Sequence, residues 1–81
     1  MWFTYILLCR DKSFYIGSSN DVEKRFSDHK NGKGGRYTRS HPVMKILYTE
    51  AFKTKSDALK REAALKKLSK AKKELLVQKN I

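Results

Sequence analysis

Hydrophobic residues form three strand-like runs along the chain. Residues 2–9 are aromatic or large and apolar at nearly every position, which predicts a strand buried on both faces. Residues 14–16 form a second short run that ends at Gly17, and the polar residues 10–13 between the two runs predict a hairpin. Residues 43–49 predict a third strand, with Pro42 at its beginning, where no hydrogen bond of the ladder is lost.

A helix is predicted between the second and third strands. It begins near Asn20, a residue type that caps helices, and Glu23 occupies the capping-box position three residues later. Asn31 and Gly32 predict its end. Its inner face, at the spacing i, i+4 and i+7, carries Val22, Phe26 and His29.

The rest of the chain predicts a loop and two more helices. Residues 32–42 are rich in glycine and basic residues and predict a flexible loop. Thr54 marks a helix that begins near Lys55, and Ser69 interrupts the pattern and caps a last helix. The element order β-β-α-β-α-α predicts one domain over residues 1–81, of the α/β (α+β) class, with helices packed on a three-stranded sheet.

Glu62 occupies an unusual position in the predicted helix after Lys55. It lies three residues after Leu59 and three before Leu65, which places it within the apolar stripe. A buried carboxylate is costly unless it is paired or binds a metal. Two interpretations therefore remain open: an ion pair with one of the many cations, or a metal ligand or catalytic acid in a basic, phosphate-binding cleft.

The charge of the chain narrows the classes of partner. Nineteen Lys and Arg against eight Asp and Glu give a net charge of +11 in 81 residues, which indicates a polyanionic partner, nucleic acid before an anionic membrane. No apolar run approaches the ~20 residues of a membrane span. The N-terminus does not resemble a signal peptide, and Cys9 is the one cysteine, so a reducing cytoplasm is the simplest compartment.

Several polar residues lie where the pattern favours apolar or neutral ones. Tyr5 is in the first strand and Tyr15 in the second, with Gly17 close behind, where a backbone could approach a ligand. Arg25 and His29 lie one turn apart on the first helix, beside its inner face. Each has an ordinary explanation: a packed tyrosine, an ion pair of Arg25 with Asp21 or Asp28, or a histidine that favours the helix dipole.

Together these residues resemble the motifs of the GIY-YIG nuclease superfamily, and most closely its small UPF0213 branch. The likeness covers nearly the whole chain. The residues that carry it are Phe3-Thr4-Tyr5, the segment from Tyr15-Ile16-Gly17 through Arg25, His29, Gly32-Lys33-Gly34, Tyr37-Thr38-Arg39 and Ala58-Leu59-Lys60-Arg61-Glu62. It implies an antiparallel three-stranded sheet flanked by helices, and metal-dependent cleavage of phosphodiester bonds.

The resemblance also implies a role for each motif residue. Glu62 would bind one divalent metal, Mg²⁺ or Mn²⁺, and Tyr5 would act as the general base or relay a proton from the attacking water. Tyr15 would position the nucleophile or the scissile phosphate, Arg25 would stabilise charge on the phosphate, and His29 would assist proton transfer. A tyrosine base with an ordinary pKa near ~10 is weak at neutral pH, so the metal, Arg25 or nearby lysines would have to lower it.

The shared site makes a geometric demand on the hairpin. Tyr5 and Tyr15 must lie on one face of the sheet, and side chains alternate between faces along a strand. The hairpin therefore needs a loop of odd length or a bulge, since a plain two- or four-residue loop would place them on opposite faces.

The chain also departs from the superfamily's pattern. Only the tyrosine of the first motif is present, and Ser18 and Ser19 stand where relatives often have Lys or Thr, so one phosphate contact is in doubt. The Asn that follows the metal ligand in many relatives has no clear counterpart other than Asn80. Many nucleases of this superfamily carry a separate DNA-recognition domain, which we do not expect within these 81 residues, so the specificity stays open.

Three hypotheses follow. The first is an endonuclease acting on DNA, including a structured or damaged form, as a monomer or with an unidentified protein partner, with DNA favoured over RNA. The second is a nucleic-acid-binding module with little or no catalysis, and the third, weaker one is a zinc site of Cys9, His29 and His41, whose spacing fits no compact site. The candidate contacts to nucleic acid are basic side chains and one aromatic residue: Lys24, Lys33, Arg36, Tyr37, Arg39, Arg61 and Lys66.

Overall fold

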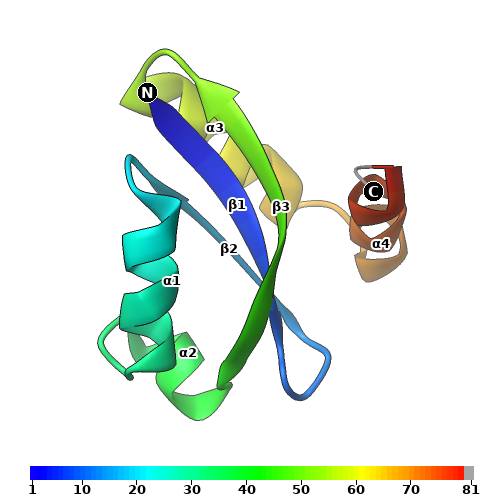
Figure 1. Ribbon diagram of the computed structural model, residues 1–81. Coiled ribbons are helices and arrows are strands. Elements are labelled where there is room, and N and C mark those ends of the chain that lie inside the picture. Colours follow the sequence, from blue (N-terminus) through cyan, green and yellow to red (C-terminus); the bar gives the residue numbers. More distant parts are fainter. Residues whose placement is uncertain (80–81) are drawn as a thin grey trace.

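A computed structural model describes residues 1–79 and confirms the predicted class and element order, with one short helix added. The elements are β1 (Trp2–Cys9), β2 (Phe14–Ser19), α1 (Val22–Lys30), α2 (Arg36–Ser40), β3 (Val43–Phe52), α3 (Lys55–Lys66) and α4 (Lys70–Lys79). The three strands form one antiparallel sheet in the order β2-β1-β3, so β1 is central and β2 is an edge strand (Figure 1).

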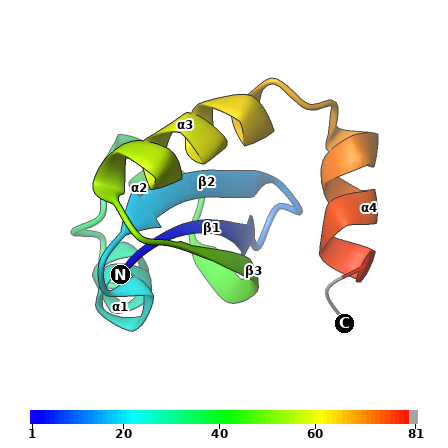
Figure 2. The same cartoon turned by 90° about the horizontal axis from the view of Figure 1, so that it is seen from above.

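The helices cover both faces of the sheet. Figure 2 shows α3 above the sheet, α1 below it, and α4 standing to one side. Because residues alternate between faces, β1 contributes Tyr5, Leu7 and Cys9 to a core between the sheet and α1. On the other face, Ile6 joins a second core with Leu65 of α3 and Val77 of α4. Burial on both faces explains the continuous apolar run of β1. Within residues 1–79, no helix has the length and apolar character that crossing a membrane requires.

The β1–β2 hairpin meets the geometric demand of the shared site. Its loop is residues 10–12: the Cys9 amide donates to the Ser13 carbonyl at 2.9 Å, and the Lys12 amide to the Cys9 carbonyl at 3.0 Å. Lys12 takes the left-handed conformation, φ 74°, that closes such odd-length loops. In the resulting register Tyr5 pairs with Gly17 and Leu7 with Tyr15, so Tyr5 and Tyr15 lie on the same face, as predicted.

Helix caps and strand ends follow the prediction in part. The cap of α1 is Asp21 rather than Asn20, because the Asp21 carboxylate accepts from the Lys24 amide at 3.1 Å; Glu23 is therefore not at the capping-box position. Thr54 and Ser69 cap α3 and α4 as predicted, each accepting an amide of its first turn. Strands β2 and β3 run three residues further than the hydrophobic pattern indicated.

The region predicted as a loop contains α2, which sequence periodicity could not reveal. Five residues are too few for a repeating apolar stripe, and the one buried side chain of α2 is the polar Thr38. The predicted stripe of α3 was also displaced. Leu59 is 44% exposed, and the buried face runs through Ala58 and Leu65. Glu62 therefore lies beside the buried face rather than within it.

Candidate active site

Tyr5 reaches from the central strand across the edge strand because Gly17 has no side chain. The two residues are register partners, and a Cβ atom on Gly17 would lie 2.6 Å from the Tyr5 hydroxyl oxygen and 3.1 Å from Cε2 of Tyr15. Both distances are too short for ordinary packing. Gly17 therefore leaves the space in which the buried Tyr5 ring lies over β2.

His29 is the hydrogen-bond partner of Tyr5. Its Nε2 atom lies 3.2 Å from the Tyr5 hydroxyl oxygen, and its Nδ1 atom lies 2.9 Å from the hydroxyl oxygen of Thr38 in α2. The ring is 1% exposed. Gly34 packs directly against it, since a Cβ atom there would lie 1.9 Å from Nδ1. Both ring nitrogens are thus engaged within the protein.

Aromatic rings surround this pair on the α1 side of the sheet. The Tyr15 ring lies 4.7 Å from the His29 ring and 6.4 Å from that of Tyr5, measured between centroids. Tyr37 of α2 continues the series, 5.9 Å from Tyr15 and stacked on His41 at 4.2 Å. The two motif tyrosines and the motif histidine therefore form one aromatic cluster, as the shared-site hypothesis required.

Arg25 lies one turn before His29 and remains accessible. Its guanidinium is 3.9 Å from the Asp28 carboxylate and donates a long hydrogen bond, 3.5 Å, to the Gly34 carbonyl. Its side chain is 38% exposed, and a guanidinium in this position is open to an anion from solvent. The charge of Arg25 also acts on the Tyr5 hydroxyl, whose pKa it lowers in part.

Glu62 approaches the same edge strand from the α3 side. Its Oε1 atom accepts a hydrogen bond of 2.7 Å from the Ser18 hydroxyl, and its Oε2 atom lies 2.8 Å from the Lys66 ammonium. Ser18 follows Gly17 on β2, so their side-chain positions alternate across the sheet. Ser18, a departure from the superfamily's pattern, thus anchors the candidate metal ligand.

Burial sets the protonation states of Tyr5 and His29. Burial, with added repulsion from Tyr15 and Glu62, raises the pKa of Tyr5 to about 12, although Arg25 lowers it in part. Burial and the nearby Arg25 charge lower the pKa of His29. At neutral pH the tyrosine is therefore protonated and the histidine neutral. A tyrosine base requires cations that lower its pKa, and in the protein alone the effect of Arg25 on Tyr5 is smaller than that of burial.

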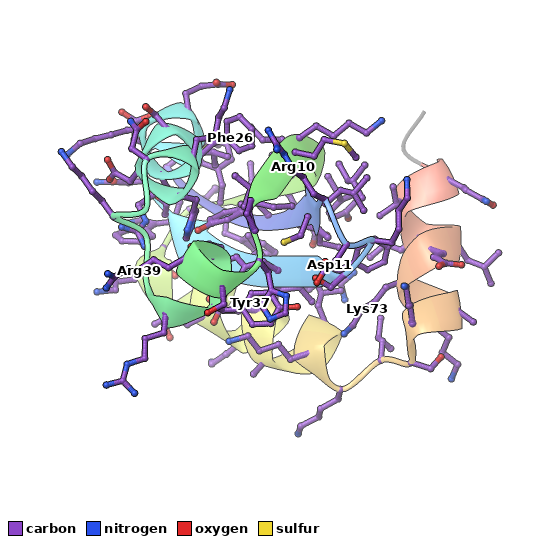
Figure 3. All side chains as sticks on the ribbon, turned by 90° about the horizontal axis from the view of Figure 1, so that it is seen from below. Arg10, Asp11, Phe26, Tyr37, Arg39 and Lys73 are labelled. Carbon is purple, nitrogen blue, oxygen red and sulfur yellow. The ribbon has the colours of Figure 1, made fainter. Side chains whose placement is uncertain are left out.

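The predicted nucleic-acid contacts fall into two groups. Lys24, Lys33, Arg36 and Arg39 are exposed on the side of α1 and α2, and the two arginines line a hollow of about 420 Å³. Tyr37 is half-exposed at a pocket of about 250 Å³ that Tyr15, Lys66 and Lys73 also line. Figure 3 shows Lys73 reaching from α4 toward Tyr37, with Arg39 on the other side of α2.

Two other predicted contacts are engaged in ion pairs. Arg61 lies 3.3 Å from the Glu50 carboxylate, and Lys66 neutralises Glu62. Asn80 lies outside the described residues.

The zinc hypothesis receives no support from the geometry. His29 is committed to Tyr5 and Thr38, and His41 Nδ1 lies 2.6 Å from a carboxylate oxygen of Asp11. Among residues 1–79, no group of three or more His, Cys, Asp or Glu side chains is placed to share a metal ion. Cys9 is buried in the core under α1.

Comparison with known proteins agrees with this geometry. The family model described as "GIY-YIG catalytic domain" matches residues 1–75. The chain is 45% identical to a UPF0213 protein of Bacillus licheniformis over 74 residues, 91% of this chain and 76% of that one. It is 40% identical to the UPF0213 protein YazA of Bacillus subtilis over 76 residues, 94% of this chain and 77% of that one.

Two solved structures are similar in both fold and sequence. The solution NMR structure of the UPF0213 protein BH0048 from Bacillus halodurans superposes with a TM-score of 0.60 at 42% identity, covering 96% of this chain and 84% of that one. That of the protein EF2693 from E. faecalis superposes with a TM-score of 0.62 at 42% identity, covering 95% and 82%.

Proposed function

The chain belongs to the GIY-YIG family, which implies a nuclease-type function, and on this basis we propose that it is a metal-dependent endonuclease that hydrolyses phosphodiester bonds in DNA. The observation that carries the proposal is the convergence at β2. Tyr5 and His29 meet beside Gly17 on one face of this edge strand, with Arg25 one turn from His29, and Glu62 meets Ser18 on the other face. A phosphate at the edge strand would be within reach of both groups.

The proposed metal ligand is Glu62. One carboxylate suits Mg²⁺ or Mn²⁺, because such ions keep several waters and complete their shell with phosphate oxygens. The side chain is 20% exposed and held on one oxygen by Ser18, while Lys66 on the other oxygen is 55% exposed and free to move aside. A bound ion would supply Lewis-acid stabilisation of charge on the phosphate. This donor set fits a hard divalent cation.

The remaining roles belong to the aromatic cluster and Arg25. Arg25 would hold a phosphate oxygen and stabilise the charge that develops there, because its guanidinium is accessible and weakly paired. Tyr15 would position the phosphate or the attacking water. Tyr5 has a pKa raised to about 12, which makes it a poor base on its own, and it would instead relay a proton from that water to the neutral His29.

Electrostatics supports nucleic acid as the substrate. The net charge of +11 and the exposed cations of α1 and α2 favour contacts to phosphates, which would make binding strongly salt-dependent. Tyr37 could stack on an unpaired base. We propose DNA before RNA, a cytoplasmic location, and action as a monomer or with an unidentified protein partner.

The test is cleavage of supercoiled plasmid and of branched or single-stranded oligonucleotides with Mg²⁺, Mn²⁺ or EDTA. Glu62→Gln and Tyr5→Phe should each lower the rate about 100-fold or more, because each removes a group that acts on the reacting atoms. Glu50→Gln is the matched control. Glu50 is also a half-buried carboxylate in an ion pair, with Arg61, but belongs to β3.

The pair between Lys66 and Glu62 supports one alternative, a nucleic-acid-binding module without useful catalysis. Here the carboxylate would be a structural partner. This alternative predicts tight, salt-sensitive binding that ignores the metal and survives Glu62→Gln, with no cleavage by the wild type.

A further inference from the structure

Thr38 is a buried polar residue to which the family resemblance assigns no role. It lies in the middle of α2 and is 2% exposed. Its hydroxyl oxygen is 2.9 Å from His29 Nδ1 and 3.5 Å from the Gly35 carbonyl oxygen. A hydroxyl group can donate one hydrogen and accept others, so Thr38 can link the two groups into a chain.

The direction of this chain follows from the Gly35 carbonyl, which can only accept. Thr38 has one hydroxyl hydrogen and donates it to Gly35, so its oxygen accepts a hydrogen from His29 Nδ1. A neutral histidine that carries its hydrogen at Nδ1 has an unprotonated Nε2. That atom then accepts the hydrogen of the Tyr5 hydroxyl, which lies within hydrogen-bond reach.

We propose that Thr38 is a positioning residue that fixes the tautomer of His29, leaving Nε2 unprotonated and directed at the Tyr5 hydroxyl. The inference rests on the proposed nuclease function for its purpose, but its geometry does not depend on that function. Gly34 makes the arrangement sterically feasible, because any side chain there would occupy the space beside Nδ1.

With this tautomer, each proton that moves in the proposed reaction has a donor and an acceptor. The attacking water transfers a proton to the Tyr5 oxygen while the tyrosine's own proton passes to His29 Nε2. The resulting hydroxide forms the new bond to phosphorus as the bond to the leaving oxygen breaks. The imidazolium keeps its Nδ1–H bond to Thr38 and later returns its proton through Tyr5 to the leaving oxygen or to solvent. With the other tautomer, Nε2 would be occupied by hydrogen and the path would be blocked.

The first test reads the tautomer directly and requires no enzymatic activity. The chain has two histidines, so ¹⁵N-labelled protein gives two imidazole spin systems, which His41→Gln assigns. At a pH above the titration of both rings, we expect His29 to show a protonated Nδ1 and an unprotonated Nε2. A protonated Nε2 in the wild type would overturn the proposal.

The second test compares Thr38→Val, which keeps the shape but removes the hydroxyl, with Thr38→Ser, which keeps the hydroxyl. Thr38→Val should lose the single tautomer and lower kcat tenfold or more, within the range that a positioned acid–base group contributes. Thr38→Ser should restore both. An unchanged tautomer in a folded Thr38→Val protein would refute the proposal, and should that variant not fold, the wild-type and Thr38→Ser spectra still decide.

The two proposals can fail separately. If the wild type cleaves nothing with any metal while His29 shows the expected tautomer, the nuclease function fails and the structural assignment of Thr38 stands. If the wild type cleaves and the tautomer is reversed, the assignment of Thr38 fails alone.

Discussion

Gly17→Ala is predicted to destabilise the protein by displacing the Tyr5 ring. The added methyl group would lie 2.6 Å from the Tyr5 hydroxyl oxygen and 2.8 Å from Cζ. The ring cannot move away freely, because it is 1% exposed and bonded to His29. Gly17 takes no positive φ, so no backbone strain contributes. The effect is therefore steric, and it falls on the proposed catalytic hydroxyl.

Two costs and one gain set the magnitude. Overpacking a rigid interior costs about 1–3 kcal/mol, and a buried hydroxyl that loses its partner costs about 1–3 kcal/mol more. Against these, alanine in a strand interior is favoured over glycine by roughly 0.5–1 kcal/mol. The midpoints of these ranges leave a net loss of about 3 kcal/mol, a large fraction of the roughly 4–12 kcal/mol expected for a domain of this size.

The assay is equilibrium unfolding in urea, with a cleavage measurement beside it. We expect a fall in the unfolding free energy of about 3 kcal/mol and a Tm lower by roughly 12–24 °C. A double-mutant cycle with Tyr5→Phe isolates the contact: removing the oxygen at 2.6 Å should reduce the cost of Gly17→Ala by about 1 kcal/mol, although Cζ stays close. A neutral or stabilising Gly17→Ala would refute the reasoning, since that is the result for an uncrowded strand glycine.

Three further predictions test the surroundings of the site. Gly34→Ala should disrupt the His29 pocket more severely than Gly17→Ala disrupts Tyr5, since its Cβ would lie 1.9 Å from Nδ1; the His29 ring resonances in NMR spectra would report it. Because burial lowers the pKa of His29, the unfolded chain binds a proton there that the folded chain resists. The unfolding free energy should therefore fall as the pH drops below about 6.5, and His29→Gln should reduce that fall relative to wild type in urea titrations at several pH values. Arg39→Ala should weaken DNA binding and reduce the slope of log K against log salt by about 0.7–0.9, the contribution of one phosphate contact; an unchanged slope would exclude Arg39 from the interface.

The sequence predicted correctly the features that depend on residues close together in the chain or on the alternation of side chains along a strand. Side-chain alternation required an odd hairpin loop if Tyr5 and Tyr15 were to share a face, and the observed loop of residues 10–12 meets that requirement. Thr54 and Ser69 were identifiable as caps because their bonds reach only three residues along the chain. Fold class and element order followed from the same local patterns.

The contacts that organise the site join distant residues and carry no periodic signal. Ser18 and Glu62 are 44 positions apart, and Thr38 reaches His29 from a helix too short to show a stripe. Of the two leucines that flank Glu62, Leu65 is buried as expected but Leu59 is exposed. The small Ala58 takes the buried position instead and allows close approach to β1. There the Thr4 hydroxyl donates to the Ala58 carbonyl at 2.7 Å, a bond that hydrophobicity alone does not reveal.

Helix α2 brings the proposed substrate contacts and the proposed proton path into one structural unit. Five residues do not form a stable helix in isolation, so α2 depends on its tertiary contacts. Thr38 anchors it to His29, and Tyr37 stacks on His41, which bonds to Asp11 of the hairpin loop. Arg36 and Arg39 lie on either side of these anchors and face solvent. A phosphate held by the two arginines would therefore lie at a distance from Tyr5 that the His29–Thr38 bond fixes. Loss of that bond would loosen substrate contact and disorder the proton path together, whereas loss of either arginine would weaken binding alone.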